Sequence, residues 1–95
     1  MDKILQLLGL IYKAKKMVIS EDEVLDHLSA IRYMFIANDI STKSKERFLK
    51  KCSYYKIDYS DKYSTEDLSK SIGKDNVKVI GITDKGFVKS IKEKI

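Results

Sequence analysis

The side chains with the clearest chemical potential in this sequence are fixed charges grouped around two predicted helix starts. Four carboxylates lie between residues 20 and 28, where no lysine or arginine occurs, whereas residues 41–56 carry six cations against Glu46 alone. Three further lysines crowd the end of the first predicted helix: Lys13, Lys15 and Lys16. Charge separated in this way favours an anionic partner such as nucleic acid. The alternative is that these charges only cap helices and face solvent, which a lysine-rich composition also produces.

Side chains suited to catalysis or metal binding are few. The single histidine, His27, and the single cysteine, Cys52, are separated by a predicted strand and most of a helix, so neither a nucleophile pair nor a zinc site is expected. The glycine-rich motifs of nucleotide-binding loops are absent. We therefore predict a protein that is not an enzyme and that has no catalytic residues, metal or cofactor. Cys52 is expected to be a buried structural thiol, and His27 a surface or packing residue.

Length and composition indicate one ordinary globular domain. The 95 residues are 43% hydrophobic and 35% charged, with a formal net charge of +5. No apolar run reaches the roughly 20 residues that cross a bilayer, and the N-terminus has no small-residue cleavage site of a signal peptide. We predict a single domain over residues 1–95 of a cytoplasmic, monomeric protein that does not contact membranes.

Helical and strand patterns alternate along the chain. We predict helices over residues 3–15, 21–29, 43–55 and about 64–73 and after Asp84, and strands over 17–19, 33–37, 56–59 and 77–82. The continuously apolar segment 33–37 is the expected centre of the sheet. Short connections between apolar strands favour a largely parallel or mixed sheet with helices on both faces. The predicted fold class is α/β, a three-layer α/β/α sandwich with a mixed four-stranded sheet.

Local signals predict helix caps and buried faces. Ser20 with Glu23 forms the sequence of a capping box, and either Asp39 or Ser41 can cap the third helix. Ser64 or Thr65 begins the fourth helix, Gly73 is its left-handed terminator, and Asp84 caps the last helix. Gly9 suggests a tight contact between helices. The third helix has a basic outer face made of Lys43, Arg47, Lys50 and Lys51. The inner faces of the third and last helices are expected to bury Phe48, Cys52, Tyr55, either Phe87 or Val88, Ile91 and Ile95.

Four segments, in their order along the chain, resemble one known family. They are LLGLIYKAKKMVISEDEV, FIANDISTKS, KCSYYKIDY and SIGKDNVKVIGITDKGF. Together they are similar to the YlxQ-type bacterial branch of the kink-turn-binding ribosomal protein superfamily, which includes archaeal L-seven-Ae and eukaryotic L-thirty-e proteins. The resemblance spans essentially the whole chain. It implies a ribosomal L-thirty-e-like fold that binds structured, ribosomal RNA and that is associated with the ribosome or with translation factors.

The resemblance also implies a site at the start of the second helix. The family has a glycine, a small residue, Asn-Glu and, three positions later, a lysine; these correspond here to Ser20, Glu21, Asp22, Glu23 and Asp26. Only Glu23 is unchanged. A carboxylate at residue 22 accepts hydrogen bonds but cannot donate as an amide does, and Asp26 reverses a charge that would seek phosphate. We therefore expect binding of structured RNA, with classical kink-turn recognition weakened.

The residues that we predict to contact RNA come from four places in the sequence. They are Lys13, Lys15, Lys16, Ser20, Asp22, Glu23, Ser41, Lys43, Lys45 and Lys74, with Arg47 beside Lys45. Lys74 belongs to the loop of residues 74–77 before the last strand, which is shorter than in the family. The alternative hypothesis is a protein-interaction module of the translation apparatus, in which the acidic helix start meets a basic partner.

Overall fold

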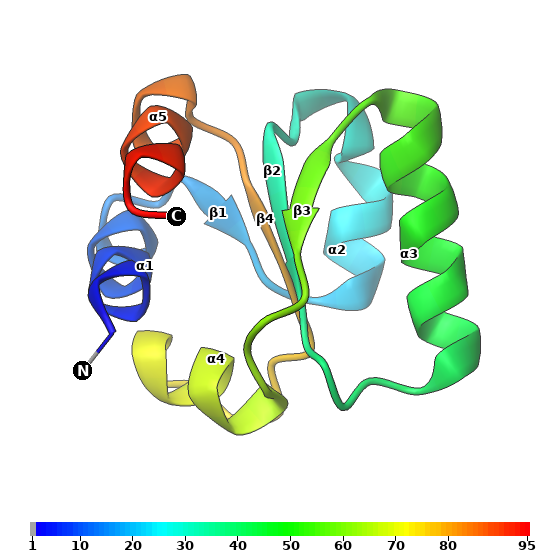
Figure 1. Ribbon diagram of the computed structural model, residues 1–95, viewed down its shortest axis with the longest axis horizontal. Coiled ribbons are helices and arrows are strands. Elements are labelled where there is room, and N and C mark those ends of the chain that lie inside the picture. The colour runs from blue at the N-terminus through cyan, green and yellow to red at the C-terminus, as the bar shows by residue number, and fades with distance from the viewer. Residues whose placement is uncertain (1) are drawn as a thin grey trace.

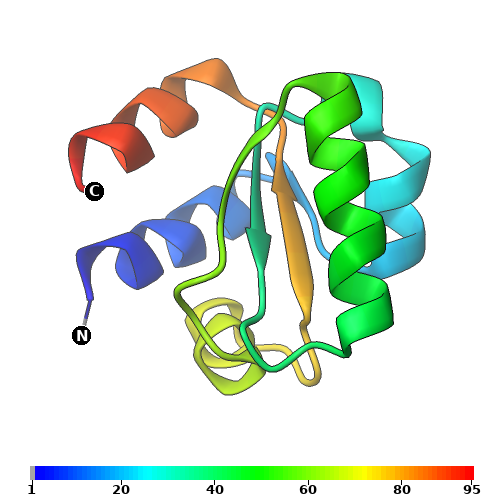
Figure 2. The same ribbon diagram turned by 45° about the vertical axis from the view of Figure 1, so that its right-hand side comes forward.

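The computed structural model describes residues 2–95, which form one mixed sheet between two layers of helices (Figure 1). The elements are α1 (Lys3–Lys13), β1 (Met17–Val18), α2 (Glu21–Asp26), the 3-10 helix η1 (Leu28–Ala30), β2 (Tyr33–Ile36), α3 (Thr42–Tyr55), β3 (Asp58–Ser60), α4 (Thr65–Ile72), β4 (Val79–Ile82) and α5 (Lys85–Glu93). Helices α1, α4 and α5 lie on one side of the sheet, and α2 and α3 lie on the other (Figures 1 and 2). The predicted three-layer α/β/α fold is confirmed.

The sheet has the strand order β1-β4-β2-β3. Strands β2 and β3 pair in parallel, whereas β4 is antiparallel to both of its neighbours. The prediction of a mixed four-stranded sheet is confirmed, and of the two alternatives the largely parallel sheet is ruled out. Within residues 2–95 the one parallel pair, β2 and β3, is joined by the long helix α3. Helix α4 then leads the chain back so that β4 enters between β1 and β2 in the opposite direction.

The core fills both sides of the two central strands. All eight residues of β2 and β4 are buried, as the apolar segment predicted. Gly81 in β4 leaves room for a neighbour, since a Cβ atom there would lie 2.6 Å from Cδ1 of Ile31. On the other layer, a Cβ atom at Gly9 would lie 2.9 Å from the carbonyl oxygen of Ser71. The tight helix contact expected at Gly9 is thus a contact between α1 and α4.

Two residues predicted to be buried lie at the surface. Tyr55 is 42% exposed, because the chain turns at Lys56 in a left-handed conformation (φ 56°) and the buried Ile57 follows instead. The Ile57 amide donates to the Cys52 carbonyl oxygen at 2.8 Å, which fixes this turn. Ile95 is 75% exposed because α5 ends at Glu93, before the apolar stripe reaches it. The predicted burial of Phe48, Cys52 and Ile91 and the cap at Asp84 are confirmed, and of the last helix's two candidates Val88 is the buried one.

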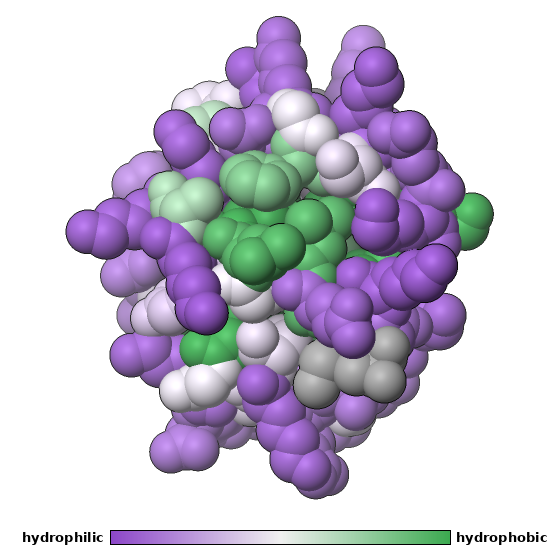
Figure 3. Space-filling model, turned by 90° about the vertical axis from the view of Figure 1, so that its left-hand side faces the viewer, coloured by the Kyte–Doolittle hydropathy of each residue, from purple (hydrophilic) through white to green (hydrophobic). Residues whose placement is uncertain are grey.

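Apolar side chains gather at the centre of the face on which α1 and α5 lie, and hydrophilic side chains surround them (Figure 3). A surface with an apolar centre offers little to phosphate groups, so a nucleic-acid interface is expected elsewhere on the molecule. None of the helices within residues 2–95 is long and apolar enough to span a bilayer.

Candidate nucleic-acid interface

Three segments meet at one end of the sheet: the start of α2, the first half of α3 and the loop of residues 74–78 before β4 (Figures 1 and 2). They enclose a groove of about 560 Å³. Its polar lining consists of Ser20, Glu21, Asp22, Arg47, Lys74, Asp75, Asn76 and Lys78. The groove unites four of the residues predicted to contact RNA: Ser20, Asp22, Arg47 and Lys74. It also contains Lys78, which the sequence reasoning missed because nothing local links residue 78 to the start of α2.

The start of α2 turns two carboxylates toward this groove. The Glu23 amide donates to Oγ of Ser20 at 3.1 Å, so Ser20 is the N-cap of α2. The predicted capping box was wrong, because the Glu23 side chain makes no return bond; the complete box is formed by Ser64 and Asp67 at α4. Glu23 is exposed but does not line the groove, whereas Glu21 and Asp22 do. His27 lies at the surface, with Nδ1 2.8 Å from the Glu23 carbonyl oxygen.

An ion pair crosses the groove. Nη2 of Arg47 lies 3.6 Å from Oε1 of Glu21, an oxygen that is buried without accepting a hydrogen bond from residues 2–95. Both side chains are otherwise partly exposed. A pair of this length and exposure contributes on the order of 0–1 kcal/mol. Arg47 is therefore held near the groove by a contact weak enough to be exchanged for a phosphate oxygen.

Two hydrogen bonds to Ser69 of α4 hold the loop of residues 74–78 in place. The Lys74 amide donates to the Ser69 carbonyl oxygen at 3.0 Å, and the amide of the buried Val77 donates to Ser69 Oγ at 2.8 Å. Gly73 ends α4 with φ 71°, as predicted. Lys74 Nζ lies 5.9 Å from the centre of the Tyr12 ring, so this lysine bridges α1 and the groove. The loop held in this way places Lys74 and Lys78 on the same side of the groove.

The predicted residues at α3 do not all face the groove. Ser41 is the N-cap of α3, accepting from the Ser44 amide at 3.3 Å. Asp39, the other predicted cap, accepts instead from the amide and hydroxyl of Thr65, and these hydrogen bonds lower the pKa of the Asp39 carboxyl. Lys45 pairs with Asp61 at 3.0 Å, away from the groove. Lys43 lies on the outer face of α3, where it lines a second hollow with Arg47.

Lys16, which follows α1, lies at the opposite end of the sheet. The amide and hydroxyl of Thr83 both donate to the Lys16 carbonyl oxygen at 3.0 Å. Thr83 and the groove residue Lys78 flank β4, so they are separated by about 17 Å of extended chain. Lys13, Lys15 and Lys16 are exposed, but they are not part of the groove. The predicted residues therefore form at least two separate basic surfaces.

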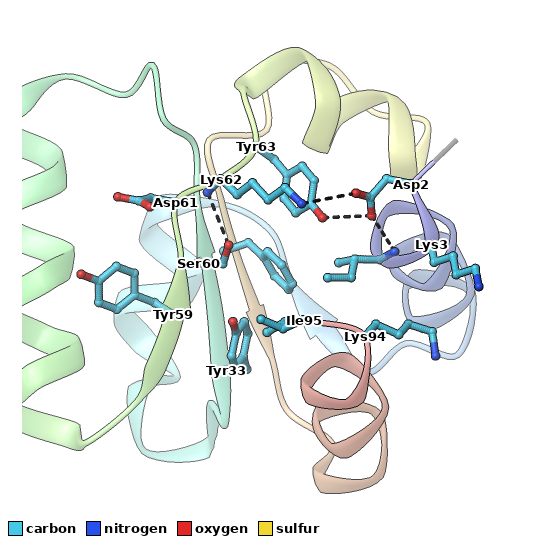
Figure 4. A pocket seen from close by; sticks show the side chains of 12 residues that line it. Asp2, Lys3, Tyr33, Tyr59, Ser60, Asp61, Lys62, Tyr63, Lys94 and Ile95 are labelled. Carbon is cyan, nitrogen blue, oxygen red and sulfur yellow. Dashed lines mark hydrogen bonds and ion pairs between the residues drawn. The ribbon is translucent and has the colours of Figure 1, made fainter.

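A third hollow, of about 540 Å³, opens between α1, β3 and the C-terminal end of α5 (Figure 4). The Tyr63 hydroxyl donates to Oδ1 of Asp2 at 2.9 Å, and Lys62 Nζ lies 3.8 Å from Oδ2 of the same carboxylate. Burial and the Asp2 carboxylate raise the pKa of Tyr63 well above its usual value. Lys3 and Lys94 also line this hollow, but none of its lining residues is among those predicted to contact RNA.

The cysteine thiol is buried and protonated. Burial raises the pKa of the Cys52 thiol to about 11, so the thiol is protonated at neutral pH and is a poor nucleophile. The predicted burial of Cys52 is confirmed, with Sγ 3.6 Å from Sδ of Met34. Within residues 2–95, no three His, Cys, Asp or Glu side chains come together as a metal site.

Two curated proteins are similar to this chain over most of its length. RNA-binding protein YlxQ of Enterococcus faecium is 34% identical over 95 residues, covering 98% of this chain and 91% of that protein. RNA-binding protein YlxQ of Bacillus subtilis is 34% identical over 87 residues, covering 90% and 87%. No family model matches the chain.

Two solved structures share the fold. A Bacillus halodurans protein of unknown function superimposes with a TM-score of 0.92 and 27% identity, covering 98% of this chain and 96% of that one. The 15.5kD RNA binding protein of Giardia lamblia superimposes with a TM-score of 0.82 over 95% of this chain and 79% of that one. Its identity is 15%, so this likeness concerns the fold alone.

Proposed function

The chain belongs to the YlxQ family of RNA-binding proteins, and on this premise we propose that it is a non-catalytic protein that binds structured RNA in the groove between α2, α3 and the loop of residues 74–78. The observation that carries this proposal is the meeting of Arg47, Lys74 and Lys78 in one groove beside the start of α2. Residues 1–95 would act as a single RNA-binding domain.

The groove offers separate groups to phosphates and to bases. Arg47, Lys74 and Lys78 supply cations for the RNA backbone, and the Ser20 hydroxyl can donate to phosphate while it accepts from the Glu23 amide. Asp22 can accept from the amino and imino groups of a guanine edge. RNA helices are recognised mainly by shape and backbone, which this mixture of groups serves.

Carboxylates in the groove argue against the usual kink-turn code. Glu21, Asp22 and Asp75 balance the three cations of the lining in formal charge. The family resemblance supports an RNA of the ribosome or of translation, and a monomeric, cytoplasmic protein. We propose that this RNA is a structured element contacted mostly through its backbone, with Asp22 as the one base-reading side chain.

A second candidate function is binding of a basic protein partner through the start of α2. Asp22, Glu23 and Asp26 are all exposed there, which is the observation in its favour. Glu21 is turned inward toward Arg47, which leaves this acidic surface smaller than the sequence suggested.

A pull-down from cell extract, with and without ribonuclease treatment, distinguishes these two functions. The proposal predicts that RNA is recovered with the protein and that co-purifying proteins disappear after treatment. Recovery of the same protein partners after complete RNA digestion, with no bound RNA before it, would support the protein-interaction module and refute the proposal.

A further inference from the structure

The outer face of α3 forms a basic hollow of about 470 Å³ that is distinct from the groove. It is lined by Lys43, Glu46, Arg47, Lys50, Lys51 and Tyr54. The steps of three and four residues place these side chains on one side of the helix. Four cations face one carboxylate, so this surface has a net positive charge, unlike the balanced lining of the groove.

The lysines of this hollow differ from other cations of α3 in their ion pairing within residues 2–95. Among residues 2–95, the ion pairs of α3 are Lys45–Asp61 and the long Arg47–Glu21 pair. Lys43, Lys50 and Lys51 take part in none of the ion pairs of this described region. Their charge is therefore available to an external anion.

An aromatic ring stands at the far end of the basic row. Tyr54 is 80% exposed, although a ring of this size is usually at least half buried. Tyr55 packs edge-on against it, with ring centres 5.1 Å apart and planes at 71°. This contact orients Tyr54 while leaving most of its surface open. Exposed aromatic rings beside basic side chains are the usual platform for unpaired bases.

Arg47 joins this hollow to the groove, since it lines both. From Lys43 to Tyr54 the helix rises about 16 Å, and a stacked strand at about 3.4 Å per nucleotide would cover this length with roughly five nucleotides. A strand that covers this whole face would contact Lys43 at one end and Tyr54 at the other, and would pass the groove at Arg47.

We propose that the outer face of α3 binds a single-stranded segment of RNA that continues from the structured element in the groove. Lys43, Lys50 and Lys51 contact its phosphates, and Tyr54 stacks on an unpaired base. This inference rests on the proposed RNA-binding function. It extends that function by defining the preferred substrate as structured RNA with a single-stranded extension.

A titration with two RNA probes tests the inference. The probes are a hairpin with tandem G·A pairs in an internal loop and the same hairpin with a five-uridine extension at each end. The extension is expected to raise the affinity of the unchanged protein about 5-fold or more, in the range that stacking of one base provides. Tyr54→Ala should lose this gain and Tyr54→Phe should keep it, because stacking does not need the hydroxyl group.

Matched variants test whether the gain in affinity depends on charge at this face or on the net charge of the protein. Lys50→Glu with Lys51→Glu should also abolish the gain, whereas Lys85→Glu with Lys89→Glu, on the exposed face of α5, should preserve it. Tyr59→Ala serves as the control for removal of an exposed ring at another place. All these positions are exposed, and circular dichroism verifies that each variant is folded.

The outcomes distinguish the inference from the function on which it rests. If the bare hairpin binds and the extension adds nothing, or if Tyr54→Ala keeps the gain, the inference is wrong and the groove proposal stands. If the unchanged protein binds neither probe, both are wrong. If polyglutamate displaces the extended probe equally from the unchanged protein and from Tyr54→Ala, the face binds acidic peptides instead.

Discussion

Nη2 of Arg47 lies 3.6 Å from the buried Oε1 of Glu21, and this contact ties the start of α2 to α3. Arg47 lines both the groove and the basic hollow of α3, so the ion pair lies between these two surfaces. Under the proposed function, this carboxylate would compete with RNA for the guanidinium group. The pair therefore sets how readily Arg47 becomes available to phosphate.

Replacement of Glu21 by Gln should raise RNA affinity several-fold, because it frees Arg47 and removes a negative charge from the groove while keeping the side chain's shape. The free energy of unfolding should change by less than about 1 kcal/mol, as expected for a partly exposed pair. RNA titration and urea unfolding measure the two effects, and Glu93→Gln on α5 is the matched control. Weaker RNA binding by Glu21→Gln would mean that the ion pair positions Arg47 for RNA.

Replacement of Gly9 by Ala should destabilise the protein although alanine is the better helix former. The helix propensity of alanine favours it by about 1 kcal/mol. The new Cβ atom would lie 2.9 Å from the Ser71 carbonyl oxygen, and overpacking of this kind costs about 1–3 kcal/mol. Urea unfolding should show a net loss, while Gln6→Ala on the exposed face of α1 should be nearly neutral. Equal or higher stability of Gly9→Ala would show that α1 and α4 are not tightly packed.

The stability of the protein should fall as the pH rises from 9 to 11. Burial raises the pKa of Cys52 from 9.0 to about 11, so in this interval the thiol ionises in the unfolded chain but stays protonated in the folded one. The contribution is fully present below pH 9 and is lost as the pH passes 11, with a magnitude of about 3 kcal/mol. Urea unfolding across this range should show a shallower decline for Cys52→Ala. Parallel pH curves for the two proteins would contradict the assignment.

Replacement of Lys16 by Glu should weaken RNA binding much less than replacement of Lys74 by Glu. Lys16 is fixed beside Thr83 at the far end of β4, whereas Lys74 lines the groove. A charge more than about 10 Å from the RNA is largely screened at physiological salt. Filter-binding titrations at 0.15 M salt compare the two variants. A larger loss for Lys16→Glu would place the interface at the end of α1.

Most of the fold could be predicted from the sequence because the signals that define its helices and strands are local. The caps at Ser41, Ser64 and Asp84 each depend on a side chain within a few residues, and the terminator at Gly73 depends on the backbone freedom of glycine. Apolar periodicity likewise identified the strands and the helices. The direction of β4 could not be predicted in this way, because it depends on pairing between residues far apart in the sequence, such as Met34 with Gly81.

The composition of the site was only partly predictable for a related reason. Lys16 and Ser20 are four residues apart, yet the extended chain of β1 carries them to opposite ends of the sheet, about 13 Å apart. Conversely, Lys78 comes from the end of a loop that residues 69 and 77 anchor beside α2. Local sequence shows which side chains could bind RNA, whereas the sheet decides which of them act together.

Filter binding of the G·A-containing hairpin over a range of salt concentrations tests the central claim most directly, with Lys74→Glu/Lys78→Glu compared with Lys85→Glu/Lys89→Glu. Both double variants change the net charge equally, but only the first changes the groove. The groove variant should lose about 10-fold or more in affinity, and the slope of log affinity against log salt should fall by about 1 for each lost phosphate contact. The α5 variant should keep nearly the affinity and slope of the unchanged protein. Equal losses in affinity and slope for both variants would contradict a specific RNA site in the groove and leave only a general attraction between a basic protein and RNA.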